Sequence, residues 1–254
     1  MDILVFRWKE KGGRNIQGCN KRCAYCIVPT VRGKEINRPL DRILEESKLL
    51  INQGAKELTY IGQTVNSWKH NGDKFYNLLD SLQDLEGLER IRFTTSFPRD
   101  ITPKMINSMK RNSKICRQLH LPVQSGSNKV LKSMNRTYSI EWYKECILKL
   151  KEAMPDLSLS TDIIVGFPGE TESEFQETLE VMNAVKFDSA FTFKYSLRAG
   201  TKAAEYSDQV PETEKQKRLE EVIKLQKRHT LSRNKAIIGR VEKVLVEKVS
   251  KRSA

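Results

Sequence analysis

The 254-residue sequence has no apolar run long enough to cross a membrane and no leader typical of a secretory signal peptide. Aromatic residues make up only 7% of it, and it has only three histidines. Its five cysteines are an odd number without a paired framework, which fits a reducing compartment better than a disulfide-stabilised fold. These absences predict a soluble, cytoplasmic protein with no membrane partner.

Charge is distributed unevenly along the chain. The net charge is +13, and a chain of this length can bury one large core. Residues 1–34 carry eight basic and two acidic side chains, and residues 221–254 carry ten basic and three acidic ones. The residues between them carry 27 of each sign. A neutral body with two basic ends predicts a polyanion held across a reactive site; the alternative is that the charge only maintains solubility.

Three cysteines share one short loop. Cys19, Cys23 and Cys26 have the spacing C-x3-C-x2-C, which can hold three irons of a [4Fe–4S] cluster and leave the fourth open to a small molecule. A zinc site usually needs four ligands in paired sets. No fourth ligand lies near, because the first histidine is His70 and the next cysteine is Cys116. The spacing therefore favours the cluster, with structural zinc or a chance grouping as alternatives.

Strand-like and helix-like segments alternate along most of the chain. This pattern predicts a parallel, barrel-like α/β domain whose chemistry lies at the carboxyl ends of the strands, and the cysteine loop follows the first strand. Thr171 and Glu174 form a Thr-x-x-Glu box typical of a helix start. Strands are expected at 15–17, 57–61, 91–94, 118–123, 157–165 and 188–195. Helices are expected from Pro39, as the first helical residue, to a close at Gly54, and at 76–85, 103–111, 127–135, 139–153, 171–185 and 212–233.

Longer stretches carry a more specific resemblance. Residues 16–230 resemble the radical S-adenosylmethionine (SAM) methylthiotransferase family, through the cysteine loop and the segments 31–35, 61–68, 120–128, 159–171 and 187–196. The Gly-Gln-x-Val-Asn pattern of 62–66 favours the branch that acts on N6-dimethylallyladenosine in tRNA. Branches that act on threonylcarbamoyl-adenosine or on a ribosomal protein are alternatives. From another class, a non-catalytic nucleic-acid-binding protein with structural zinc also remains open.

The resemblance implies a domain organisation. Residues 16–233 would form a partial (β/α)6 TIM-like radical SAM barrel, and 234–254 would be the truncated start of a small β-barrel RNA-binding (TRAM) domain. Residues 1–15 would be an atypical tail. The family carries a further N-terminal domain whose three cysteines hold a second, auxiliary cluster that delivers sulfur. The ligands of that cluster are expected to be absent here, so the chain would be the core of the enzyme.

The resemblance also implies a mechanism. Cys19, Cys23 and Cys26 would hold a [4Fe–4S] cluster whose open iron is chelated by SAM. One-electron cleavage of SAM would give a 5′-deoxyadenosyl radical, which abstracts hydrogen from C2 of the modified adenosine next to the anticodon, where the methylthio group is added. The partners would be the anticodon loop of tRNA and an electron donor such as flavodoxin or ferredoxin, and a monomer is expected.

Individual site residues follow from this comparison. His120, in a predicted strand, is interpreted as a core histidine rather than a catalyst. Arg136 could pair with the SAM carboxylate or a phosphate, or could be a surface arginine. The residues expected to contact SAM are Tyr25, Gln63, Asn66, Gln124, Ser125, Ser160 and Asp162. Those expected to contact RNA are Arg22, Arg32 and Lys34 around the loop and Arg240 and Lys243 near the C-terminal end.

Overall fold

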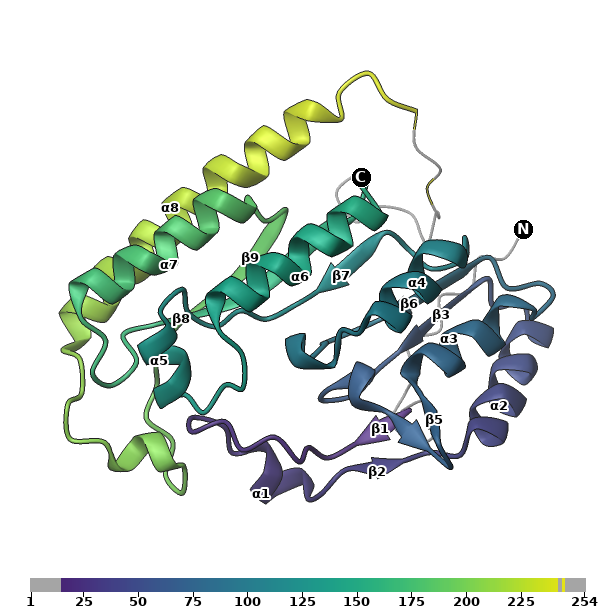
Figure 1. Ribbon diagram of the computed structural model, residues 1–254, viewed down its shortest axis with the longest axis horizontal. Helices are drawn as coiled ribbons and strands as arrows, with labels where there is room; N and C mark the ends of the chain where they lie inside the picture. The colour runs from purple at the N-terminus through teal and green to yellow at the C-terminus, as the bar shows by residue number, and fades with distance from the viewer. Residues whose placement is uncertain (1–14, 242–243, 245–254) are drawn as a thin grey trace, which may run out of the picture.

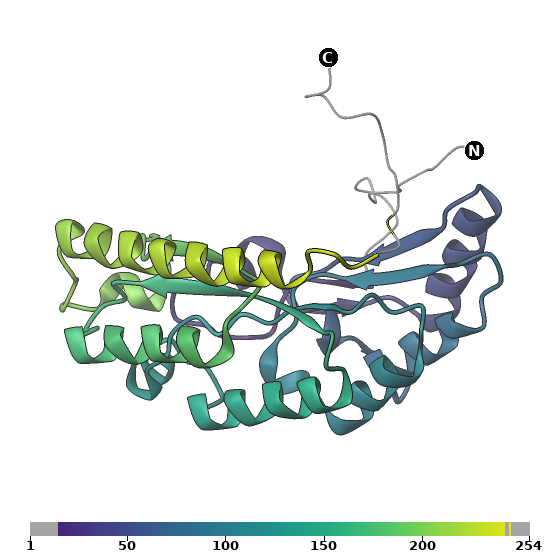
Figure 2. The same cartoon turned by 90° about the horizontal axis from the view of Figure 1, so that it is seen from above.

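The computed structural model describes residues 15–241 and Val244, which form a curved sheet with helices along its outer side (Figures 1 and 2). Consecutive helices pack against one another in the order α2, α3, α4, α6, α7 and α8. The strands are β1 (Ile16–Gln17), β2 (Ile36–Asn37), β3 (Glu57–Tyr60), β4 (Lys69–His70), β5 (Asp73–Lys74), β6 (Arg90–Phe93), β7 (Gln118–His120), β8 (Ser158–Val165) and β9 (Ser189–Lys194). The α-helices are α1 (Val28–Arg32), α2 (Leu40–Asn52), α3 (Phe75–Gln83), α4 (Pro103–Arg111), α5 (Asn128–Ser133), α6 (Ile140–Ala153), α7 (Glu172–Val185) and α8 (Glu212–Ala236). Three short 3-10 helices are η1 (Val65–Ser67), η2 (Pro98–Asp100) and η3 (Lys202–Glu205).

The main strands are parallel, as predicted. β3 pairs with β6, and β8 pairs with β7 on one side and β9 on the other. A parallel bridge between Ile91 and Ile115 connects β6 to the segment that leads into β7. The order along the sheet is therefore β3, β6, β7, β8, β9, which is the arrangement of a partial α/β barrel. The predicted fold class is confirmed.

The first strand differs from the prediction. β1 does not pair with β3 as a further parallel strand; it forms a two-residue antiparallel pair with β2, in which Ile16 lies opposite Asn37. The hairpin of β4 and β5 and the short helix α1 were not predicted either. Elements of two to five residues contain too few positions for a hydrophobic period to appear in the sequence.

Helix ends follow local capping chemistry. Thr171 caps α7: its Oγ1 accepts a hydrogen bond from the Glu174 amide at 3.3 Å, and the Glu174 carboxylate accepts one from the Thr171 amide at 2.7 Å. This confirms the predicted capping box. Pro39 is the residue before α2 rather than its first helical residue. No helix in the described part of the chain is long and apolar enough to cross a membrane.

The last helix, α8, ends later than predicted. α8 continues to Ala236, beyond the predicted end at Arg233. Its first turn lies beside the turn after β8, and its last turns lie beside the start of β9, where Thr230 Oγ1 donates to the Asp188 carbonyl. The TRAM-like segment predicted for 234–254 lies largely outside the described residues, as does the tail before Asn15.

A buried ion pair fastens α8 to the turn that follows β8. Arg218 Nη1 donates to Glu170 Oε1 at 2.8 Å and to the Glu170 carbonyl at 3.0 Å. The same Oε1 accepts the Gly166 amide at 2.8 Å. The two side chains are only 5% and 1% exposed. Because a buried charge without a partner is costly, the pair ties the two segments together.

Removing the guanidinium should destabilise the fold. Arg218→Met leaves the Glu170 carboxylate buried and unpaired, and we expect the free energy of unfolding to fall by about 3 kcal/mol. Arg111→Met is the matched control, since its pair with Asp80 is largely exposed and should be worth less than about 1 kcal/mol. Urea denaturation of both variants measures the difference; equal losses would contradict the assignment.

Candidate functional site

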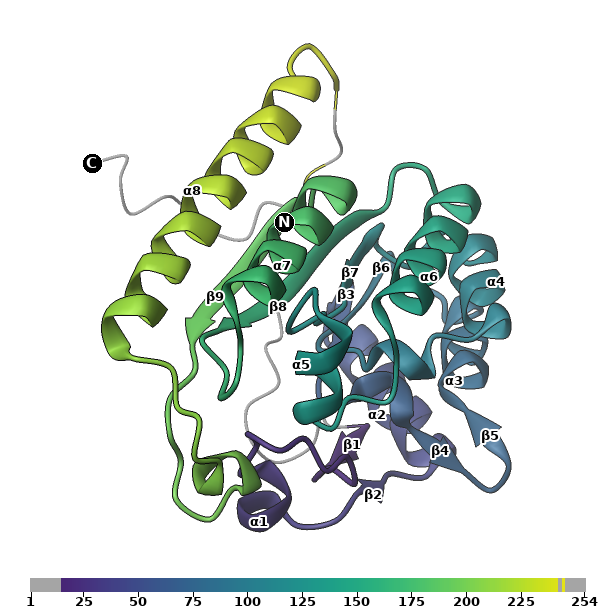
Figure 3. The same ribbon diagram turned by 60° about the vertical axis from the view of Figure 1, so that its left-hand side comes forward.

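The cysteine loop lies between β1 and α1, at the carboxyl ends of the parallel strands (Figure 3). The Ala24 amide donates to the carbonyl of Met134, just after α5, at 2.9 Å. The Ala24 carbonyl accepts from the amide of Ala203, after β9, at 2.8 Å. Segments more than 100 residues away thus hold the middle of the loop in place. The predicted position of the loop in the fold agrees with the structure.

Gly18 allows the loop to close at its base. Its φ is +75°, and an added Cβ would lie 2.2 Å from the Lys34 carbonyl oxygen. The chain can approach this closely only because glycine has no side chain. The next amide, of Cys19, donates to the Gly33 carbonyl at 3.1 Å, and Asn20 exchanges hydrogen bonds with Glu35. The loop is therefore clamped to the segment that follows α1.

The three thiols differ in exposure. Cys19 is buried, whereas Cys23 and Cys26 are half-buried. Burial raises the pKa of Cys19 and of Cys26, and the neighbouring cysteine sulfurs raise it further. Both are therefore neutral thiols in the apo chain, and binding iron would release their protons.

The loop offers three cysteine donors, the number that a [4Fe–4S] cluster with one open iron needs. Within residues 15–241 and Val244, no three His, Cys, Asp or Glu side chains are gathered closely enough to hold one metal ion. In a [4Fe–4S] cube each cysteine binds a different iron, so the sulfurs stand further apart than around one zinc. Three cysteines on one loop, without a fourth ligand, match that chemistry.

Arg136 lies under the loop rather than on the surface. Its Nη1 donates to Cys23 Sγ at 3.2 Å and its Nε to the Tyr138 hydroxyl at 3.0 Å. The guanidinium also covers the ring of Phe97, 4.7 Å from the ring centre. The guanidinium thus contacts a loop sulfur and two aromatic side chains at once. Arg136 therefore contacts the cysteine loop directly, through the sulfur of Cys23.

A pocket of about 400 Å³ opens beside the loop. It is bounded by the last loop cysteine, by the ends of β8 and β9 and by the segment after β9. Its size is in the range of small-molecule sites. The lining residues are Tyr25, Cys26, Ile27, Val28, Gln124, Asp162, Ile164, Phe193, Lys194, Tyr195, Ser196 and Arg198.

Tyr195 lines this pocket and carries an unsatisfied hydroxyl. Its hydroxyl is buried and has no hydrogen-bond partner among the described residues. Burial raises the pKa of Tyr195, so the hydroxyl keeps its proton. Phe167 packs edge-on against Tyr195 at 5.3 Å and against Tyr25 at 6.4 Å between ring centres. Tyr195 is therefore a pocket residue whose buried hydroxyl is not satisfied by the described part of the chain, which is uncommon in folded proteins.

Some predicted SAM contacts meet at this pocket. Tyr25, Gln124 and Asp162 all line it. Ser160 lies two residues before Asp162 on β8, and its hydroxyl is 3.0 Å from His120 Nδ1. His120 Nε2 is 3.4 Å from Asp162 Oδ1, so both ring nitrogens have neighbours within the fold.

Other predicted SAM contacts lie elsewhere. Both polar atoms of the Asn66 side chain bond to the backbone of Phe97, at 2.9 and 2.7 Å. The Ser125 hydroxyl accepts the Ser127 amide at 3.1 Å. Neither residue lines the pocket beside the cysteines. Gln63, after β3, does not line it either, although its Oε1 is buried without a partner in the described structure.

The predicted RNA contacts fall into two groups. Arg22, Arg32 and Lys34 are exposed around the cysteine loop. Arg240 is exposed beyond the far end of α8, a helix of 25 residues and thus about 37 Å long. Figures 1 and 3 show that end pointing away from the loop, so the structure does not bring Arg240 to the others. Lys243 lies outside the described residues.

Sequence reasoning missed the residues that follow the last strand. Tyr195, Ser196 and Arg198 line the pocket; the first two lie in the resembling segment 187–196, but none of the three was expected to contact SAM. The available signal was position, since residues at the carboxyl end of a parallel strand face the site of an α/β fold.

The chain belongs to the Radical SAM superfamily, whose family model matches residues 16–182. Two relatives carry the name tRNA-2-methylthio-N(6)-dimethylallyladenosine synthase. The one from Clostridium botulinum (strain Loch Maree / Type A3) is 49% identical over 92% of this chain and 53% of its own length. The one from Thermoanaerobacter sp. (strain X514) is 50% identical over 94% and 51%. The chain thus spans about half the length of the curated relatives it matches.

Solved structures support the fold. Coproporphyrinogen III oxidase (HemN) from Escherichia coli superimposes with a TM-score of 0.63 at 20% identity, covering 85% of this chain and 52% of that one. The methyltransferase TsrM from Kitasatospora setae gives 0.62 at 18% identity, covering 76% and 38%. At such identities the likeness concerns the fold alone, and it agrees with the partial barrel described above.

Loop closure can be tested at two glycines. Gly18→Ala should prevent the approach to Lys34 and lower both thermal stability and iron uptake. Gly33→Ala is the matched control, because Gly33 has the same φ of +75° but nothing lies within 4 Å of an added Cβ. The control should cost only the backbone strain, about 1–2 kcal/mol. Iron per chain after anaerobic reconstitution is the measurement; equal iron in both variants would contradict the argument.

Proposed function

We propose that this chain is the radical SAM core of a tRNA methylthiotransferase, which adds a methylthio group at C2 of N6-dimethylallyladenosine next to the anticodon. The observation that carries the proposal is the pocket of about 400 Å³ whose lining includes Cys26 of the three-cysteine loop together with Gln124 and Asp162. The names of the relatives supply the substrate. Because they are about twice as long, methylthiolation belongs to the whole protein, with its sulfur-delivering auxiliary cluster.

Cys19, Cys23 and Cys26 would hold the [4Fe–4S] cluster, and the adjacent pocket would hold SAM. When bound, these groups supply one-electron reduction and an organic radical for hydrogen abstraction. Arg136 keeps positive charge beside Cys23. Tyr25, Phe167 and Tyr195 present an aromatic wall that excludes water from the reacting centre.

The polar groups of the pocket suit SAM. Gln124, which bridges to Ile163 of β8 beyond the end of β7, and Asp162, within β8, both line the pocket and can meet the hydroxyl and amino groups of the ligand. Gln124 has a φ of +72°, a backbone conformation that is uncommon outside glycine and concentrates at functional sites. Arg198 adds a cation opposite Cys26 that can pair with a carboxylate.

The proposal includes partners and location. Arg22, Arg32 and Lys34 would contact phosphates of the anticodon loop. A flavodoxin or ferredoxin would supply the electron to a monomeric protein in the cytoplasm. The threonylcarbamoyl-adenosine and ribosomal-protein branches are distinguished by the modified product, because only the proposed activity changes the mass of dimethylallyl-adenosine in tRNA.

SAM cleavage is the direct test. The chain is reconstituted anaerobically with iron and sulfide, then given SAM and dithionite, and we expect 5′-deoxyadenosine to form. Cys23→Ala should lose both bound iron and product, because one cluster ligand is missing. Cys116→Ala is the matched control, since that cysteine lies before β7, away from the loop, and should retain both. Zinc in place of iron and labile sulfide would contradict the proposal in favour of a structural metal site.

The Tyr195 hydroxyl provides a second test. Tyr195→Phe removes a buried donor that has no partner, so thermal stability should not fall, while the Kd for SAM should rise about three- to tenfold. Tyr206→Phe is the control: its hydroxyl donates to the Ser133 carbonyl at 3.2 Å, so its loss should cost about 1 kcal/mol of stability and leave the Kd unchanged. Equilibrium binding of SAM to the reconstituted protein measures both. An unchanged Kd in Tyr195→Phe would remove Tyr195 from the site.

A further inference from the structure

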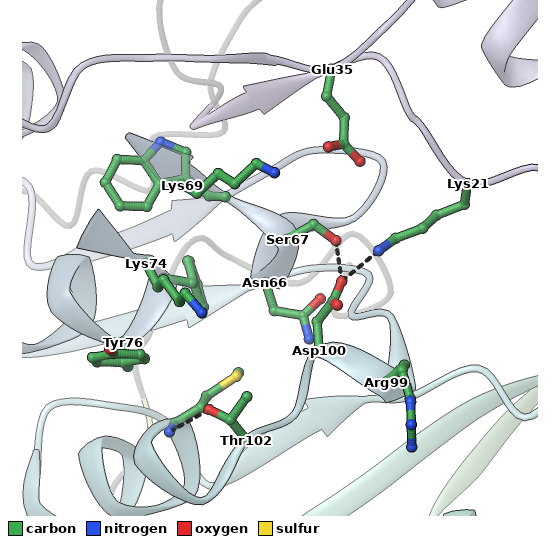
Figure 4. Close-up of a pocket in the computed structure, with 13 residues that line it drawn as sticks. Lys21, Glu35, Asn66, Ser67, Lys69, Lys74, Tyr76, Arg99, Asp100 and Thr102 are labelled. Atoms are coloured by element: carbon green, nitrogen blue, oxygen red, sulfur yellow. Dashed lines mark hydrogen bonds and ion pairs between the residues drawn. The ribbon is translucent and has the colours of Figure 1, made fainter. Parts of the chain in front are cut away.

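A second cavity, of about 230 Å³, lies on the other side of the cysteine loop. It is formed by the β4–β5 hairpin, η1, η2 and the start of α4, together with Lys21 of the loop. Figure 4 shows Lys21, Lys69 and Lys74 directed toward the same space. None of these lysines was among the predicted RNA contacts. The cavity is separate from the pocket proposed for SAM, with which it shares no lining residue.

Lys69 and Lys74 stand in an unfavourable arrangement. They are direct partners in the register of β4 and β5, so two positive charges face each other across a two-residue hairpin. Like charges directly opposite on neighbouring strands destabilise the pair. Neither lysine forms an ion pair with any residue that the structure describes. Such a conflict is expected where an anion from outside completes the arrangement.

The acidic groups of the cavity are already engaged. The Lys21 amine lies 2.8 Å from Asp100 Oδ2, and the Ser67 hydroxyl donates to the same oxygen (Figure 4). Glu35 accepts hydrogen bonds from the amide and the side chain of Asn20, both at 3.2 Å. The bonds from Asn20 leave the charge of Glu35 in place, but the cavity is lined by four cations (Lys21, Lys69, Lys74 and Arg99) and two carboxylates, so its net charge is positive.

We propose that this cavity binds a backbone phosphate of the RNA substrate through Lys69 and Lys74. The inference rests on the proposed function and adds where the RNA backbone is held. Lys21 lies between two of the loop cysteines, so a strand anchored in the cavity runs past the reactive loop. A phosphate between the two amines relieves their repulsion and releases counterions from the RNA, which is the main source of such affinity. Trp68, buried and with its Nε1 donating to the Arg38 carbonyl at 2.9 Å, holds the base of the hairpin.

The test measures binding of an anticodon stem-loop RNA that carries dimethylallyl-adenosine to the 254-residue chain at several salt concentrations. We expect Lys69→Gln/Lys74→Gln to weaken binding roughly tenfold and to lower the slope of log K against log salt by about 1 to 2. Lys110→Gln/Lys144→Gln, which removes the same charge from α4 and α6, should bind as wild type. Lys69→Arg/Lys74→Arg should also bind as wild type, since it keeps the charge, and it serves if the Gln variant folds poorly.

The outcomes separate this inference from the function on which it rests. If wild type binds the RNA and the Lys69→Gln/Lys74→Gln variant behaves as its charge-matched control does, the cavity is not an RNA site. If inorganic phosphate raises the melting temperature of wild type but RNA binding is equal in all variants, the cavity holds free phosphate and the inference is overturned. Failure of wild type to bind the RNA would overturn the proposed substrate itself, and this inference with it.

Discussion

The buried contact between Arg218 and Glu170 connects the last helix to the reactive end of the barrel. Glu170 also accepts the Gly166 amide, so the ion pair fixes the turn after β8 in its left-handed conformation, with φ of +68° at Gly166. The next residue, Phe167, packs against Tyr25 of the cysteine loop and against Tyr195 at the end of β9. A charge on α8 thus determines where an aromatic ring lies under the loop.

Ordering a loop of thiols costs conformational entropy, roughly 1–2 kcal/mol for each residue fixed. The structure offsets this cost with hydrogen bonds from three distant segments: Gly33–Glu35, Met134–Arg136, and Ala203. These bonds join the loop backbone, the Asn20 side chain and the Cys23 sulfur to other parts of the domain. The thiols are therefore presented by the whole domain, which explains why a short motif alone does not make such a site.

Much of the fold could be predicted from local chemistry. α4 was predicted with its observed ends, because Pro103 can begin a helix and the following turns have a clear apolar face. The position of Cys19 at the end of the first strand was correct, although that strand pairs with β2. The β4–β5 hairpin was missed because a two-residue strand has no period to recognise.

The candidate site was predictable only in part, because its contacts span the sequence. Asn66 has the residue type of a ligand contact, yet both ends of its amide bond to Phe97, 31 residues later. Arg136 reaches Cys23 across 113 residues. A local sequence pattern does not determine which side chains the fold brings together. Polar residues at strand ends therefore indicate the region of a site but not its individual contacts.

The lysines near the loop are of two kinds: one is paired with a carboxylate, and two face each other. Lys21 is compensated by Asp100, and its ion pair joins the cysteine loop to η2. Lys69 and Lys74 oppose each other on a hairpin whose hydrogen bonds and buried Trp68 hold them there in spite of the repulsion. A surface selected for solubility alone would separate such charges, since distance removes the repulsion at no loss. The rigid support beneath the two lysines is what distinguishes a place for an external anion from an ordinary exposed basic patch.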